Sequence, residues 1–283
     1  HAHMDHFIGF DHFLRICLGR DQDISLFGPP GFMAHVESKF GAYTWNLVEN
    51  YTNRLRFAVT EVGESCRKSA RYECGRSFRK EGYEEKKQGP GCLVDRDDLF
   101  VQGVLLDHQV PSLAVSVAEK QHLHIKKNVL DAMNLPVGPW LTELKKSLLR
   151  NDPDDTEITV RGKKPDPAAP KVRLSLGYLR DSVVGVSPGK KIAYVADALY
   201  SEENRRKIVE LASGATVLII EAPFLQEDRE RAFQKYHLTA TQAGSLAREA
   251  GAGNLMIFHF SPMYRSREEE LVREAREAFR HPG

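Results

Sequence analysis

Apolar residues along the chain follow two spacings, one typical of strands and the other of helices. An apolar run at 24–27 ends in a Gly-Pro-Pro-Gly turn, and a helical pattern at 34–51 and a strand pattern at 55–62 follow it. Between 64 and 98 the pattern is lost and charged side chains gather. We expect a solvated, charged insertion at about 64–98, or a pair of ragged strands.

The middle of the chain predicts two strands with a histidine between them. Residues 101–106 and 113–117 are rich in strand-forming side chains, so His108 falls in a turn or at a strand end. Loops at strand ends are where functional sites are usually built. Two helical patterns follow, at 126–133 and 141–149.

The last third of the chain predicts a layered α/β arrangement, because strand and helix patterns alternate there. The strands are expected at 191–196, 216–220 and 255–258, and the helices at 202–212, 239–250 and 266–279. A chain of 283 residues with 41% apolar side chains can bury one substantial core. We therefore expect a single α/β domain over 1–283, with the charged insertion at about 64–98 and a polar, proline-bearing loop or arm at about 151–170.

Charge places a condition on any nucleic-acid partner. Forty Lys and Arg residues stand against 39 Asp and Glu residues, so the formal net charge is +1 and attraction to a polyanion needs a local patch. The stretch 67–87 is locally basic, with Tyr72, Phe78 and Tyr83 between its charges. It could grip an RNA backbone through charge and stacking, but its acidic residues make a mixed surface insertion the simpler interpretation.

The cysteines and the hydropathy exclude two other classes. Cysteines at 17, 66, 74 and 92 form no C-x-x-C pair of the kind that holds a structural zinc, so we expect reduced, unpaired thiols. No window has the roughly 18 consecutive apolar residues of a membrane span. We expect no membrane partner.

The first six residues carry the densest chemistry, His1-Ala2-His3-Met4-Asp5-His6. Two zinc ions held close together need about seven to eight ligand bonds from imidazole and carboxylate, with one carboxylate bridging. This H-x-H-x-D-H segment can supply four of those ligands. A purification-tag remnant is the alternative, but tags rarely interleave Asp, and the sequence continues without a break.

At this motif the chain resembles the metallo-β-lactamase superfamily, and in particular the tRNA 3′-processing endonuclease family called ribonuclease Z. The order of ligands in that family implies His108, Asp197 and His259 as the remaining ones. Asp197 stands in Ala-Asp-Ala where the family carries Gly-Asp-Thr, and Met263 stands where an Arg is usual. These departures keep the ligands but remove a flanking hydroxyl, which puts the hydrogen bonding around the metals in doubt.

Three further segments narrow the resemblance to ribonuclease Z. The sequence His237-Leu-Thr-Ala resembles the H-x-T-A segment whose His assists phosphodiester cleavage, while Thr239 would also cap a helix. Glu221 ends a strand and would either orient His237 or cap a helix. The stretch 135–141 resembles the one that leads into the substrate-handling region of the family.

The resemblance implies an αββα sandwich, and because His1 already belongs to the first motif we expect strands that precede it in the family to be absent from this chain. It implies two Zn²⁺ ions, or other divalent ions, and the ligands are His1, His3 and His108 for the first, Asp5, His6 and His259 for the second, and Asp197 between them. A metal-activated hydroxide, oriented by Asp5, would attack phosphorus while His237 acts as the acid. The implied substrate is RNA, specifically a tRNA precursor, and the implied protein is a cytoplasmic homodimer.

Two rival interpretations remain open at this point. The first is a metallo-β-lactamase-fold hydrolase of a small ester, thioester or cyclic phosphodiester without tRNA recognition, which the altered neighbours of Asp197 and Met263 support. The second is an RNA-binding scaffold with a degenerate site. That second interpretation predicts lost ligands, whereas all seven are present.

Overall fold

The computed structural model describes residues 1–120, 122–162, 172–187 and 189–281. The chain divides into two compact units. The first unit comprises His1–Leu93, Gln102–Ser116 and Ile192–Gly283, and the second comprises Val94–Val101 and Val117–Lys191. Residues 163–170 of the arm expected at 151–170 lie outside the described residues.

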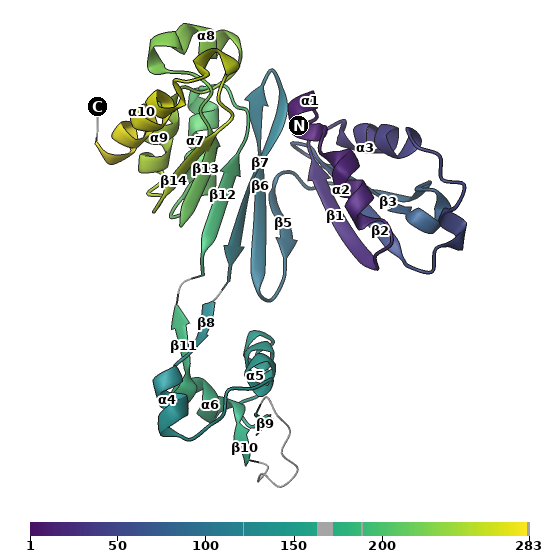
Figure 1. Cartoon of the computed structure of the whole chain (residues 1–283), viewed down its shortest axis with the longest axis vertical. Coiled ribbons are helices and arrows are strands. Elements are labelled where there is room, and N and C mark those ends of the chain that lie inside the picture. Colours follow the sequence, from purple (N-terminus) through teal and green to yellow (C-terminus); the bar gives the residue numbers. More distant parts are fainter. Residues whose placement is uncertain (121, 163–171, 188, 282–283) are drawn as a thin grey trace. The chain divides into compact units, whose positions relative to one another are not determined.

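A four-stranded sheet in the order β1-β2-β3-β4 forms the N-terminal part of the first unit (Figure 1). Its parallel pair is followed by two antiparallel steps, and the strands are β1 Gln22–Gly28, β2 Leu55–Val62, β3 Arg67–Glu73 and β4 Lys80–Lys86. Helices α2 (Phe10–Cys17) and α3 (Phe32–Gly41) contribute to its core, which is rich in aromatic rings. Phe40 and Phe78, for example, stack with ring centroids 4.5 Å apart.

Most of a six-stranded mixed sheet, in the order β14-β13-β12-β7-β6-β5, belongs to that unit. Its strands are β5 Gly91–Asp95, β6 Leu99–His108, β7 Val110–Glu119, β12 Lys191–Val195, β13 Val217–Glu221 and β14 Leu255–Phe258. The last three run parallel. Helices α7 (Glu202–Ala212) and α9 (Ala240–Glu249) connect these successive parallel strands, as expected for α/β units. The ends of β5, β6, β7 and β12 at residues 94–95, 99–101, 117–119 and 191 belong to the second unit.

The core of this sheet is built from small and aliphatic side chains, including Ala193, Ile220 and Leu246. Helices α7, α9 and α10 (Glu268–Arg280) lie beside strands β12, β13 and β14 in Figure 1. Short elements complete the unit: α1 Met4–Phe7, α8 Arg229–Gln234, η1 Val48–Asn50, η2 Cys74–Arg76, η3 Gln226–Asp228 and η4 Pro262–Tyr264.

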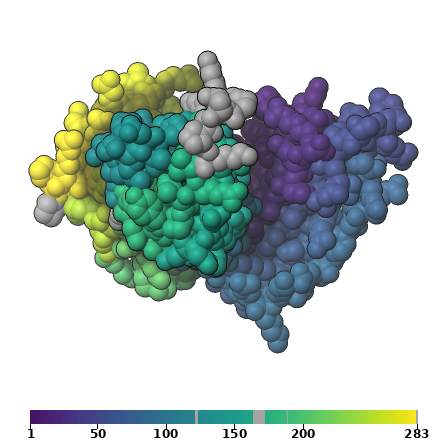
Figure 2. Space-filling model, turned by 90° about the horizontal axis from the view of Figure 1, so that it is seen from below, coloured from purple at the N-terminus to yellow at the C-terminus, as the bar shows by residue number. Residues whose placement is uncertain are grey.

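The second unit has its own small core around the buried Trp140. It contains α4 Lys127–Ala132, α5 Trp140–Leu149 and α6 Leu176–Val183, with the antiparallel pairs β8 His122–Ile125 with β11 Val184–Ser187 and β9 Glu157–Val160 with β10 Val172–Ser175. Gly138 lets two segments approach, because a Cβ there would lie 1.9 Å from the Arg161 carbonyl oxygen. In Figure 2 the atoms of this unit form the closely packed teal and green surface.

One helix predicted from the sequence pattern is longer than the helix in the structure. The predicted helix at 34–51 is wrong in its second half, because α3 ends at Gly41 and only η1 follows. Aromatic and β-branched residues after Gly41 have low helix propensity. The indole of Trp45 instead folds back and donates to the Phe40 carbonyl at 2.7 Å, which satisfies one of the groups left open at the helix end.

Residues 64–98 hold three strands, β3, β4 and β5, where the sequence left open a charged insertion or a pair of ragged strands. Tyr72 and Phe78 are buried in the core, so they are not available to stack on RNA, whereas Tyr83 is exposed. Among the helices that the structure describes, none is long and apolar enough to cross a membrane.

Candidate metal centre

Three adjacent parallel strands bring acidic and imidazole groups to one sheet edge. Asp197 follows β12, Glu221 is the last residue of β13, and His259 follows β14. Because the carboxyl ends of parallel strands meet at the same edge, these three side chains come together although 62 positions separate Asp197 from His259. His108, the last residue of β6, and the N-terminal motif reach the same place from other parts of the unit.

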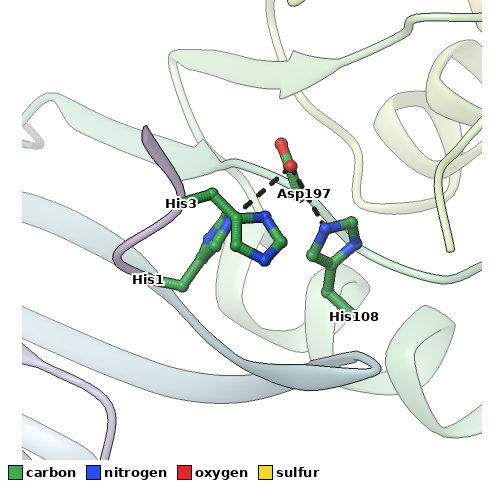
Figure 3. A group of neighbouring side chains, drawn as sticks. All are labelled: His1, His3, His108 and Asp197. Atoms are coloured by element: carbon green, nitrogen blue, oxygen red, sulfur yellow. Dashed lines mark ion pairs between the residues drawn. The ribbon is translucent and has the colours of Figure 1, made fainter. Parts of the chain in front are cut away.

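The first group of potential ligands is His1, His3, His108 and Asp197, whose ligand atoms all lie within 4.8 Å of one another. Figure 3 shows the three imidazoles gathered around the Asp197 carboxylate. Asp197 Oδ2 lies 3.3 Å from His108 Nε2 and 3.6 Å from His1 Nε2. The ring of His3 packs edge-on against that of His1, with centroids 4.4 Å apart.

The second group is Asp5, His6 and His259. Asp5 and His6 lie in the single turn of α1, and Asp5 Oδ2 is 3.4 Å from His6 Nε2 and 3.1 Å from His259 Nε2. Asp197 joins the two groups, because its other oxygen, Oδ1, lies 3.2 Å from both His6 Nε2 and His259 Nδ1.

The buried polar atoms of the cluster fit bound cations. His1 Nε2, His6 Nε2 and Asp197 Oδ1 are buried without a hydrogen-bond partner of acceptable geometry. Leaving a buried polar atom unsatisfied costs about 1–3 kcal/mol. Imidazole nitrogens and carboxylate oxygens that converge in this way form the donor set of a zinc-type site.

The protonation state of His108 suits metal coordination. Its Nδ1 donates to the Tyr236 carbonyl at 2.7 Å, so the Nε2 lone pair is directed toward Asp197. Burial lowers the pKa of His108, and the neutral imidazole is the form that binds a metal. For Asp197, burial opposes ionisation, but the imidazoles of His6 and His259 outweigh it and lower the pKa of that carboxyl.

A third carboxylate, that of Glu221, lies beside His237 and His259 and is fully buried. Its Oε2 is 2.8 Å from His237 Nδ1 and 3.2 Å from His259 Nδ1. Its Oε1 accepts from the backbone N–H groups of Ala198 at 2.8 Å and Leu238 at 3.2 Å. The hydrogen bond to Glu221 raises the pKa of His259 to about 9, so a metal must displace a proton there and binding to the metal-free protein weakens as pH falls.

The structure brings together all nine residues that the sequence singled out, namely His1, His3, Asp5, His6, His108, Asp197, Glu221, His237 and His259. Sequence reasoning missed the groups that hold them. The Tyr236 carbonyl and the hydroxyl of Ser112, 3.4 Å from His1 Nδ1, have no signature in the sequence. Lys235 also lines the cavity of about 430 Å³ over the cluster, and its position beside the H-x-T-A segment was the only available signal.

Comparison with known proteins supplies the family. A ribonuclease Z of Deinococcus radiodurans is 30% identical over 281 residues, which cover 99% of this chain and 80% of that protein. This chain belongs to the ribonuclease Z family. A second ribonuclease Z, from Trichodesmium erythraeum, is 27% identical over 288 residues, which cover 99% of this chain and 72% of that protein. No protein-family model matches the chain.

A solved structure confirms the fold class of this ribonuclease Z family member. The crystal structure of human tRNase Z, short form, superposes with a TM-score of 0.51 at 18% identity and covers 94% of this chain and 71% of that chain. The chain therefore has an α/β metallo-β-lactamase fold with mixed sheets. It combines that fold with clusters of His and Asp side chains that can hold metal.

Proposed function

We propose that this ribonuclease Z family member is a dinuclear zinc phosphodiesterase that processes the 3′ end of tRNA precursors. The observation that carries the proposal is the position of Asp197, with one carboxylate oxygen beside His1 and His108 and the other beside His6 and His259. A carboxylate shared in this way is what two adjacent cations require.

The ligand assignment follows from the two groups. His1, His3 and His108 would hold one ion, Asp5, His6 and His259 would hold the other, and Asp197 would bridge them. Two bound zinc ions, or other divalent cations, would polarise the phosphate and lower the pKa of a water molecule toward neutrality. Asp5 is the most exposed of these carboxylates and borders the cavity over the cluster, so it can orient the attacking water as well as bind.

His237 is placed to act on the leaving oxygen. The buried Glu221 carboxylate accepts from its Nδ1 at 2.8 Å, which holds the ring in one orientation and one tautomer. His237 also lines the cavity over the cluster, so the opposite ring nitrogen is available to a phosphate bound there. Phosphodiester cleavage places extra negative charge on the non-bridging and leaving oxygens, and a positioned imidazolium can donate to them.

The small-substrate hydrolase remains the second candidate because Asp197 lacks the flanking Thr of the family. One hydrogen bond at this position does not depend on a Thr side chain. Glu221 takes its hydrogen bond from the backbone N–H of Ala198, a bond that any residue at this position could make.

A direct comparison of substrates tests the proposal. The metal-loaded protein should cleave a 3′-extended tRNA precursor at one position with kcat/KM well above that for bis(p-nitrophenyl) phosphate. If the protein hydrolyses the aryl diester, or a small ester or thioester, but does not cleave the tRNA precursor, the result would favour the second candidate. The family resemblance further implies a homodimer, and a monomeric mass by light scattering would contradict that part.

A further inference from the structure

A second cavity is lined mainly by residues of α8, the helix that comes just before His237 in the chain. It has a volume of about 380 Å³, within the range of ligand pockets, and its lining residues are Tyr200, Arg229, Glu230, Phe233, Gln234 and Gln242. Gln234 lines this cavity, while its neighbour Lys235 lines the cavity over the metal cluster. Consecutive residues of the chain therefore line the two cavities.

Phe233 is the most distinctive wall of the second cavity. Its side chain is 62% exposed, more than any other Phe, Tyr or Trp among residues 1–120, 122–162, 172–187 and 189–281. The preceding residue, Ala232, is buried in the core and fixes how α8 sits. An exposed aromatic ring next to a buried anchor residue is a platform on which a base can stack.

Backbone hydrogen bonds hold the segment that links the two cavities. The His237 N–H donates to the Ala232 carbonyl at 2.9 Å, and the Lys235 N–H donates to Arg231 at 3.1 Å. Tyr236 adopts a left-handed conformation with φ of 60° and presents its carbonyl to His108. The spacing between Phe233 and His237 is thus set by the same turn that orients the metal cluster.

The side chains of the two cavities suit different parts of one nucleotide: the cavity over the metal cluster suits its phosphate, and the cavity at α8 suits its base. Lys235, beside the metal cluster, forms no ion pair with any described residue, and the same holds for Arg229. An unpaired Lys at this point can neutralise a backbone phosphate. The second cavity combines aromatic rings with the amides of Gln234 and Gln242 and the carboxylate of Glu230, which would repel a phosphate but can accept hydrogen bonds from the amino groups of a base.

We propose that the cavity at α8 binds an unpaired nucleobase of the RNA, next to the scissile phosphate, with the base stacked on Phe233 and the adjoining phosphate beside Lys235. This inference rests on the proposed function and adds a specificity element to it. Stacking tolerates every base, so the cavity favours a single-stranded nucleotide over a paired one.

The test combines a protein variant with an altered substrate. Phe233→Ala should raise KM for a 3′-extended tRNA precursor roughly 5- to 100-fold with kcat little changed, the range expected for losing one stacked base. Phe233→Trp should restore KM. Methyl p-nitrophenyl phosphate, which carries no base, should be hydrolysed equally by all variants. Leu47→Ala, which removes a similarly exposed apolar side chain just before η1, is the matched control and should behave as wild type.

Precursors with a single abasic nucleotide on either side of the cleavage position locate the base. For one of these two abasic substrates, wild type and Phe233→Ala should have the same KM, because the Phe233 ring of the wild type then has no base to stack on. An unchanged KM in Phe233→Ala would overturn the inference, and so would an equal loss on the base-free substrate or a change of oligomeric state. A wild-type protein that leaves the precursor intact would instead overturn the proposed function itself.

Discussion

Asp197 is the residue on which the site depends. Its neighbours, Ala196 and Ala198, add no polar side chain, yet each carboxylate oxygen lies within 3.6 Å of imidazole nitrogens from separate segments. The strand-end position of this acid could be predicted from the sequence. The backbone N–H of Ala198 as a partner for Glu221 could not, because main-chain hydrogen bonds depend on the fold and not on the residue type.

His237 and Asp197 should fail in different ways when they are changed. His237→Ala should lower turnover of an RNA or aryl phosphodiester roughly 100-fold, the scale of a lost general acid, while the metal content stays the same. Asp197→Ala should lower activity by losing metal. Activity and metal content measured on both variants separate these two effects.

His12→Ala is a matched control for the His237 variant, because this imidazole is exposed on α2. It should leave both activity and metal content at wild-type values. If His237→Ala keeps phosphodiester cleavage within about twofold of wild type, no general-acid contribution remains. The small-substrate hydrolase would then be the better interpretation.

At the scale of elements, the alternation in the last third was the most predictable part of the chain. The strands at 191–195, 217–221 and 255–258 fall within two residues of the expected positions. Thr239 caps α9 with Gln242 in a capping box, as its place before the helical pattern indicates. The predicted length of helix α3 is too great because the apolar residues beyond Gly41 belong to a loop. In that loop the Trp45 indole donates to the Phe40 carbonyl at the end of the helix.

Tyr264 shows how the loop after His259 is held. It is buried in η4, donates to Asp228, and accepts from the Leu225 N–H at 3.2 Å. Burial, reinforced by Asp228, raises the pKa of Tyr264 to about 12, so it acts as a neutral phenol. Tyr264→Phe should lower the free energy of unfolding by about 1–3 kcal/mol, the cost of leaving the buried Leu225 N–H without its partner.

The denaturant midpoint of Tyr264→Phe should therefore fall without a change in the m-value. Tyr83→Phe is the matched control, because the exposed Tyr83 hydroxyl donates to the exposed Glu85 two residues away. It should unfold at the wild-type midpoint. Equal midpoints for the two variants would show that the Tyr264 hydroxyl does not hold this loop.

At the scale of the whole molecule, the site is assembled from segments that lie far apart in the sequence. Residues 1–6, His108, Asp197 and His259 meet only when the first unit folds. Their identity could be predicted because the ligand order resembles that of a known family. Their distances, the Tyr236 carbonyl and the cavity at α8 could not, since they arise from packing between segments rather than from local pattern.

Metal stoichiometry tests the central claim most directly. Seven ligands, one of which is the shared Asp197 carboxylate, exceed what a single tetrahedral ion uses. Protein loaded with zinc, freed of excess metal and measured by elemental analysis should contain about two zinc ions per chain. One ion per chain, or none after zinc loading, would contradict a dinuclear centre at Asp197.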